Sequence, residues 1–291
     1  MRTLIQVPDG LKRKALEIAD KTDGGIICSE SCYGGCDLRD HEASLLGCEK
    51  IIHIGHSKFV DGELPVEYQD FKTKVNPVPI LNKDISKLSN YKSIGLVTSL
   101  QFIDSIGSVK SALEENGKQV FLSKSKKLQQ GQILGCDITA ALSVEKKVDC
   151  FLVVGSGKFH ALGLALATDK PVLILDVEQS EITETEMIKQ LMQKQSYAAM
   201  ALAKDARKFG ILISTKPGQM KIDVAEDLKK KLVEAGKKVY MFAMDEITPT
   251  KLEGFGMDAY ICTACPRIAI ENRIAFGKPI LNPNEAEEIF K

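Results

Sequence analysis

The sequence predicts an α/β protein built from three pseudo-symmetric lobes, each a four-stranded parallel sheet flanked by helices. Short runs rich in Val, Ile and Leu alternate with helical patterns along the whole chain, as in parallel sheets that are buried on both faces. One unit is also repeated: IIHIGHSKF (51–59) aligns without a gap with FLVVGSGKFH (151–160), and YICTACPR (260–267) is a third copy. At 291 residues the chain exceeds one compact core, which fits several lobes.

Four strands are expected in each third of the chain. They are Thr3–Val7, Gly25–Cys28, Lys50–Ile54 and Pro77–Leu81; then Ser93–Thr98, Gln119–Leu122, Cys150–Val154 and Pro171–Asp176; then Phe209–Ser214, Lys238–Phe242, Ala259–Thr263 and Pro279–Leu281. The first helices of the second and third lobes match as well, and Gly117 and Gly236 each end a helix before a strand.

The lobe boundaries are expected in two polar or helical stretches, Asn82–Asn90 and Glu184–Arg207. The second stretch places Met187, Ile188, Leu191 and Met192 among polar residues, which is typical of an amphipathic helix. These boundaries give lobes over residues 1–86, 87–195 and 196–291.

Composition excludes several classes of function. Lys+Arg and Asp+Glu are both 39, so the chain has no basic excess to hold a nucleic-acid backbone. No apolar run is long enough to span a bilayer, and no signal peptide precedes the first charges. The expected location is the cytoplasm, where the eight cysteines stay reduced or bind metal.

Three cysteines follow strand ends, one in each lobe: Cys36, Cys136 and Cys265. Ligands of parallel α/β sheets gather beyond the carboxyl ends of the strands, so a pseudo-threefold arrangement would bring these thiolates to one point. A single free cysteine is usually a small buried hydrophobic residue. Three of them in loops of small residues favour an iron–sulfur cluster with one iron left open.

The other five cysteines are weaker candidates. Cys28, Cys150 and Cys262 lie in strands and are expected in the core, and Cys48 lies at a helix end. Cys32 stays open, because Cys28, Cys32 and Cys36 faintly resemble a local radical-enzyme motif with a last gap one residue too long. Cys262 and Cys265 would make half a zinc site, but no second pair accompanies them.

The four histidines divide by position. His41 is expected on a helix surface and His53 in a strand core, whereas His56 and His160 lie in strand-end loops with equal claims to a site or a structural role. Two turns, Gly155-Ser156-Gly157 and 215–219, follow strands and could offer backbone N–H groups to a carboxylate or a ribose. Neither GxGxxG nor GxxxxGK[ST] occurs, so dinucleotide and P-loop sites lack their motifs.

Six segments together resemble the archaeal diphthamide-synthesis family of non-conventional radical S-adenosylmethionine enzymes. They cover all three lobes in the family's order, with YGGC in place of the more usual YGAC. They are SCYGGCDL (31–38), HIGHS (53–57), GQILGCD (131–137), GSGKFHALGLAL (155–166), STKPGQ (214–219) and TACPR (263–267).

The resemblance implies a homodimeric transferase that catalyses the first step of diphthamide biosynthesis. It implies a [4Fe–4S] cluster on Cys36, Cys136 and Cys265, S-adenosylmethionine as substrate, and an electron donor. The 3-amino-3-carboxypropyl group would move by a radical mechanism to C2 of a histidine in translation elongation factor 2, releasing methylthioadenosine. Substrate contacts are implied for Gly155, Ser156, Gly157, Ser214, Thr215, Gly218, Gln219 and Arg267, with His56 and His160 as possible catalytic residues.

Three alternatives stay open. A non-catalytic partner subunit of the family would keep the fold and lose ligands, whereas all three cysteines are present here. A quinolinate-synthase-like enzyme also has three lobes and a three-cysteine cluster, and would act on small dicarbonyl substrates. A purely structural three-lobed binding protein would purify colourless.

Overall fold

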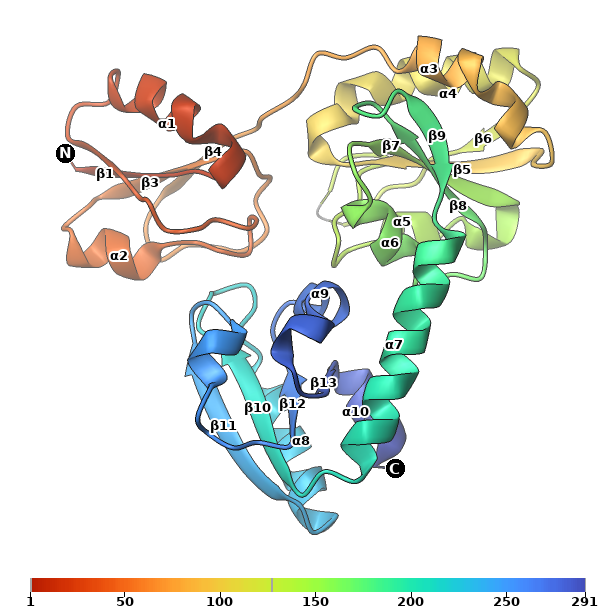
Figure 1. Cartoon of the computed structure of the whole chain (residues 1–291). Helices are drawn as coiled ribbons and strands as arrows, with labels where there is room; N and C mark the ends of the chain where they lie inside the picture. The colour runs from red at the N-terminus through yellow and green to blue at the C-terminus, as the bar shows by residue number, and fades with distance from the viewer. Residues whose placement is uncertain (1, 127, 291) are drawn as a thin grey trace. The chain divides into compact units, whose positions relative to one another are not determined.

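The computed structural model describes residues 2–126 and 128–290, and its strands form three separate sheets (Figure 1). The chain divides into two compact units, residues 1–189 and 190–291. The first unit holds two sheets and the second unit holds one, so the predicted three-sheet α/β architecture is confirmed.

The first sheet is entirely parallel, in the order β2-β1-β3-β4. Alternate residues of its central strands pack on opposite faces, because successive side chains of a strand point opposite ways. Ile5 and Ile52 pack with Ala15 of α1 on one face, whereas Leu4 and Ile51 pack on the other face with a cluster that includes α2. The elements are β1 (Thr3–Gln6), α1 (Lys12–Ala19), β2 (Gly25–Ile27), α2 (Asp40–Leu45), β3 (Lys50–Ile54) and β4 (Val66–Gln69).

The predicted strand Pro77–Leu81 is wrong. This segment forms helix α3 (Val78–Lys83), with Pro77 at its N-cap and Pro79 in its first turn, where a missing N–H costs nothing. Leu81 is fully buried in the core of the second sheet. The fourth strand of the first sheet is instead β4, a partly exposed edge strand.

The second sheet has five strands in the order β6-β5-β7-β8-β9, and the last is antiparallel to its neighbour. The sequence did not indicate β9, since its residues EITE are mostly polar. The elements are β5 (Ser93–Thr98), α4 (Ile106–Glu115), β6 (Gln119–Phe121), α5 (Thr139–Leu142), β7 (Cys150–Gly155), α6 (Phe159–Ala165), β8 (Val172–Asp176) and β9 (Glu181–Glu184).

The third sheet is parallel, in the order β11-β10-β12-β13. The predicted helical stretch before it is confirmed as α7, which begins after β9. The elements are α7 (Glu186–Lys204), β10 (Lys208–Ser214), α8 (Ile222–Glu234), β11 (Lys238–Met244), β12 (Ala259–Cys262), α9 (Pro266–Glu271), β13 (Ile280–Leu281) and α10 (Pro283–Ile289).

All three sheets place their strands in the same order, with the first strand between the second and the third. The repeated segments therefore occupy equivalent positions, because β3, β7 and β12 each pair with the first strand of their own sheet. Gly117 and Gly236, with φ of +74° each, end α4 and α8 as the repeat predicts. Within the described residues no helix combines the length and apolar character needed to cross a bilayer.

Candidate metal and substrate site

Burial separates the eight cysteines into two groups. Cys28, Cys32, Cys48, Cys150 and Cys262 are buried, whereas Cys36 and Cys265 are half-buried and Cys136 is exposed. Burial raises the pKa of the Cys150 and Cys262 thiols to about 12, which keeps them protonated and unreactive. The three accessible thiols are the three that the repeat singled out.

The Cys36 loop is held rigidly between β2 and α2. Arg39 ties it at both ends, because its guanidinium donates to the carbonyl of Ser31 at 2.9 Å and pairs with Asp37 at 3.5 Å. Asp37 in turn accepts the N–H of Tyr33 at 3.3 Å. A Cβ at Gly35 would collide with the backbone oxygen of Ser57, so the glycine that replaces the family's usual alanine matches this close approach.

The Cys136 loop uses the same device in the second sheet. Asp137 follows the cysteine, as Asp37 does, and its carboxylate accepts the N–H and hydroxyl of Thr139 at 3.1 and 2.6 Å. Ser125 also donates to this carboxylate, at 3.4 Å. In both lobes an aspartate closes the loop and leaves the preceding cysteine accessible.

Cys265 lies at the N-cap of α9, directly before Pro266. The chain leaves β12 through Thr263, whose N–H and hydroxyl both donate to the carbonyl of Leu212 at 3.0 Å. This anchors the loop to β10. Arg267 follows on α9, is buried, and forms an ion pair with Glu271 one turn further on.

The 214–219 loop lies at the end of β10. Ser214 is buried and ties the loop together: its hydroxyl donates to the carbonyl of Asp245 at 3.3 Å and accepts the N–H of Lys216 at 3.2 Å. Gln219 is buried, while Thr215 is exposed and Gly218 is half-buried. Lys216, in the same loop, has a buried ammonium group 3.3 Å from the carboxylate of Asp245. This ion pair was not predicted from the sequence, although Lys216 lies inside the STKPGQ segment.

The Gly155–Gly157 turn follows β7, as predicted. The N–H of Gly157 donates to the carboxylate of Asp176 at 3.1 Å, and the same carboxylate accepts the N–H groups of Glu178 and Gln179. Asp176 therefore fixes the turn from the end of β8. The Gly157 N–H is used within the protein, and Ser156 is half-buried beside it.

The histidines have three different environments. His41 is exposed on α2, as predicted, and His160 is half-buried at the start of α6 against the Phe159 ring. His53 is fully buried, and its Nε2 lies 3.0 Å from Nδ1 of half-buried His56. Burial lowers the pKa of His53 to about 3 and that of His56 to about 4, so both rings are neutral at pH 7.

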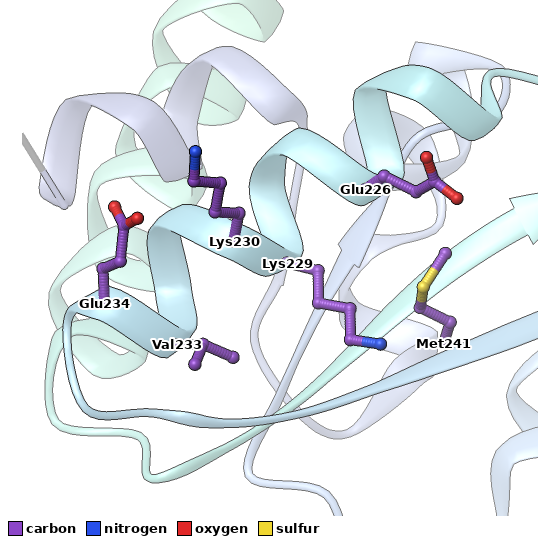
Figure 2. Close-up of a pocket in the computed structure, with 6 residues that line it drawn as sticks. All are labelled: Glu226, Lys229, Lys230, Val233, Glu234 and Met241. Atoms are coloured by element: carbon purple, nitrogen blue, oxygen red, sulfur yellow. The ribbon is translucent and has the colours of Figure 1, made fainter.

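Two shallow grooves lie elsewhere in the second unit, along β11. One, between α8 and β11, is lined by Glu226, Lys229, Lys230, Val233, Glu234 and Met241 (Figure 2). The other is lined by Lys208, Tyr240, Met241, Phe242, Phe255 and Met257. Neither groove includes a cysteine, a histidine or any residue of the candidate site.

Cys36 and Cys136 belong to the first unit and Cys265 to the second. The meeting of the three thiolates at one point thus stays a prediction of the repeat. What the structure establishes is that each lies in an anchored segment between a strand and the next helix.

Comparisons with known proteins match diphthamide-synthesis proteins over nearly the whole chain. A family model described as "Putative diphthamide synthesis protein" matches residues 7–291. The 2-(3-amino-3-carboxypropyl)histidine synthase of Pyrococcus horikoshii is 34% identical over 294 residues, covering 98% of this chain and 84% of that protein. Subunit 1 of the same synthase from Schizosaccharomyces pombe is 30% identical, covering 99% of this chain and 70% of the relative.

Solved structures give the same result. Dph2 from Pyrococcus horikoshii superposes with a TM-score of 0.92 at 33% identity, covering 99% of this chain and 86% of that one. A second structure of that protein, described as containing a 4Fe-4S cluster, matches equally well.

Proposed function

The chain belongs to the diphthamide synthesis protein family, and from this premise we propose that it is a 2-(3-amino-3-carboxypropyl)histidine synthase. The proposed reaction is the first step of diphthamide biosynthesis. The 3-amino-3-carboxypropyl group of S-adenosylmethionine moves to C2 of a histidine in translation elongation factor 2, and methylthioadenosine leaves. The observation that carries the proposal is the accessibility of Cys36, Cys136 and Cys265 among eight cysteines.

These three residues fit a [4Fe–4S] cluster by the chemistry of the donor set. Thiolates are the usual ligands of such clusters, and three of them leave one iron with an open position. Four of the buried cysteines do not suit this role, since Cys28 and Cys48 pack in a core and burial keeps the Cys150 and Cys262 thiols protonated. When bound, a reduced cluster supplies the one electron that breaks the sulfonium bond to the methionine γ-carbon and forms an aminocarboxypropyl radical.

The chain's own residues would bind and orient the substrate. Arg267 lies two residues after Cys265 and carries the planar donor fork that suits the methionine carboxylate. Its ion pair with Glu271 orients the guanidinium. Ser214, Thr215, Gly218 and Gln219 would contact the substrate from the end of β10, and Gly155–Gly157 from the end of β7.

Which sulfonium bond breaks is a matter of positioning. Conventional radical enzymes break the bond to the ribose carbon, so the substrate-binding residues of this chain would have to orient S-adenosylmethionine for cleavage at its γ-carbon instead. The anchored cysteine loops suit that task, because Arg39, Asp137 and Thr263 fix the backbone around each cysteine.

The proposal extends to organisation and partners. One ligand would come from each lobe, over residues 1–86, 87–195 and 196–291, in a cytoplasmic homodimer served by an external electron donor. His56 and His160 are the candidate catalytic histidines of this proposal, and no proton-transfer step is assigned to either.

The test uses anaerobically purified protein, a chemical reductant, S-adenosylmethionine and archaeal elongation factor 2. We expect methylthioadenosine as the small product and one aminocarboxypropyl group on a single histidine. Replacing that histidine in the factor should stop labelling while some cleavage of S-adenosylmethionine continues. 5′-Deoxyadenosine as the main product would contradict the proposal, and a colourless protein without iron would favour a binding protein.

A further inference from the structure

A second cluster of ligating side chains lies in the first lobe, apart from the three accessible cysteines. Cys32 Sγ is 4.0 Å from His53 Nε2 and 4.0 Å from His56 Nδ1, and the two ring nitrogens are 3.0 Å apart. Cys32 is 5% exposed and His53 is fully buried. The three ligating atoms lie within 4.8 Å of one another.

The spacing matches a tetrahedral metal. Zinc binds cysteine sulfur at about 2.3 Å and histidine nitrogen at about 2.0–2.1 Å. Tetrahedral angles then place the two nitrogens about 3.3 Å apart and each about 3.6 Å from sulfur. The observed separations differ from these by less than about 0.5 Å, a change that side-chain rotation supplies.

The protein also fixes the tautomer that a metal needs. Gln6 lies opposite His53 in the β1–β3 register. Its amide is oriented by the backbone, since Nε2 donates to the carbonyl of Asp37 and Oε1 accepts the N–H of Arg39 at 3.3 Å. Oε1 therefore accepts from His53 Nδ1, 3.3 Å away, and this ring carries its proton on Nδ1. The lone pair of Nε2 is left pointing at Cys32 and His56.

Metal-bound histidines usually donate their second ring N–H to an acceptor of this kind, which holds the ring in place. Tyr68 fixes the ring further, with its centroid 5.2 Å from that of His53 and its hydroxyl donating to the carbonyl of Val60 at 3.2 Å. In the absence of metal, His56 Nδ1–H donates to His53 Nε2, so the cluster is satisfied as a hydrogen-bonded chain. Metal binding would move the His56 proton from Nδ1 to Nε2 and release the proton of the Cys32 thiol, whose pKa burial raises to about 12.

We propose that Cys32, His53 and His56 form a binding site for a zinc-class divalent cation, with a fourth position open to water beside half-buried His56. One thiolate and two imidazoles are the ligand types that suit zinc. The site joins the loop that carries Cys36 to the end of β3, so its effect is to clamp that loop. It does not depend on the proposed enzymatic activity.

The test measures zinc and iron separately on the full-length protein, purified without chelator, together with Co²⁺ titration of zinc-free protein that retains its iron. We expect one zinc per chain and a thiolate-to-cobalt charge-transfer band. Cys32→Ser should remove the band and weaken zinc binding at least tenfold, and His56→Gln, at a less buried position, should also weaken it. Cys48→Ser, at an equally buried cysteine of the same lobe, should leave zinc unchanged, and Cys36→Ala should lose iron and keep zinc.

Two results would overturn the proposal. Wild-type protein that gives no charge-transfer band with Co²⁺ has no such site. Zinc that persists in both Cys32→Ser and His56→Gln is bound elsewhere. Circular dichroism of each variant separates loss of the ligand from loss of the fold.

Discussion

The carboxyl edges of the first and second sheets occupy the same place in the repeat and are built in different ways. At the ends of β1 and β3 the first lobe has side chains that hydrogen-bond to one another: Gln6, His53 and His56, with Cys32 beside them. After β7 the second lobe has a glycine turn whose backbone N–H groups are held by the carboxylate of Asp176. The topology is shared, so the chemistry of each lobe lies in the loop at the end of the strand.

The difference teaches how one scaffold takes on separate tasks. A network of neutral imidazoles and a thiol can ligate a cation, whereas a glycine turn lets a ligand approach the backbone closely. The cysteine loops share an aspartate directly after the cysteine, and that aspartate anchors the loop through Tyr33 in the first lobe and through Thr139 in the second. Substitutions in matching loops should have the same effect on iron content in both lobes. Substitutions in the loops that differ should affect stability or substrate binding in one lobe only.

The largest effect is expected at the shared feature. Cys36→Ala and Cys136→Ala should each deplete iron and abolish activity, because either change removes one of the three proposed ligands. Iron analysis and the visible spectrum of anaerobic protein measure this. Cys48→Ala and Cys150→Ala are matched buried controls that should alter stability and keep iron. Normal iron in Cys136→Ala would break the likeness between the lobes.

A pH dependence is expected of the first lobe. Burial lowers the pKa of His53 to about 3 and of His56 to about 4, against 6.5 in the unfolded chain. The unfolded chain therefore binds more protons below pH 6.5, and the folded state loses stability as pH falls from there towards 4. At pH 5 the loss is about 2 kcal/mol for each histidine.

Denaturant unfolding of metal-free protein between pH 7 and pH 5 measures this slope. His56→Gln should flatten it, whereas His41→Gln, at an exposed histidine, should leave it unchanged. Equal slopes in all three proteins would mean that the buried histidines are not a feature of the folded first lobe.

In the second lobe the feature to test is the carboxylate of Asp176, which holds the glycine turn. Asp176→Ala leaves the N–H groups of Gly157, Glu178 and Gln179 without their acceptor and should cost about 1–3 kcal/mol. Asp176→Asn keeps one oxygen as acceptor and should cost less. Iron should be retained in both, with a higher KM for S-adenosylmethionine. An unchanged KM would remove the turn from the substrate site.

The smallest expected effect is at the third sheet. Arg267→Lys keeps the charge and loses the bidentate fork, so substrate should bind about tenfold more weakly at normal iron content. Isothermal titration with S-adenosylmethionine measures this. Glu271→Gln removes the ion pair alone and is the control for a role confined to supporting the loop. Equal affinity in wild type and Arg267→Lys would leave Arg267 with that supporting role.

Much of the fold was readable from the sequence because buried parallel strands are nearly continuous apolar runs. Lys50–Ile54 was predicted and found residue for residue, and CFLVV at Cys150 differed by one. Edge strands lack this signal, so VEYQ and EITE were missed. VPIL at 78–81 was misjudged, since a short apolar run does not distinguish a strand from a buried helix.

The accessible cysteines were also predictable, since repeated motifs mark them. The grouping of Cys32 with His53 and His56 was not, because these residues lie 21 to 24 positions apart and meet only through strand register and loop packing. His53 was expected to be a satisfied core residue, and it is one: Gln6 satisfies it. No local sequence pattern showed that its Nε2 faces Cys32 and His56.

Each sheet takes all its strands from one continuous stretch of chain, β1 to β4, β5 to β9 and β10 to β13. During synthesis a sheet can therefore close as soon as its own segment has left the ribosome, without waiting for a strand encoded later. The three proposed ligands emerge in the same order, one for each sheet. A cluster held by all three would therefore wait for Cys265, by which time the segments of the first two sheets have already been made.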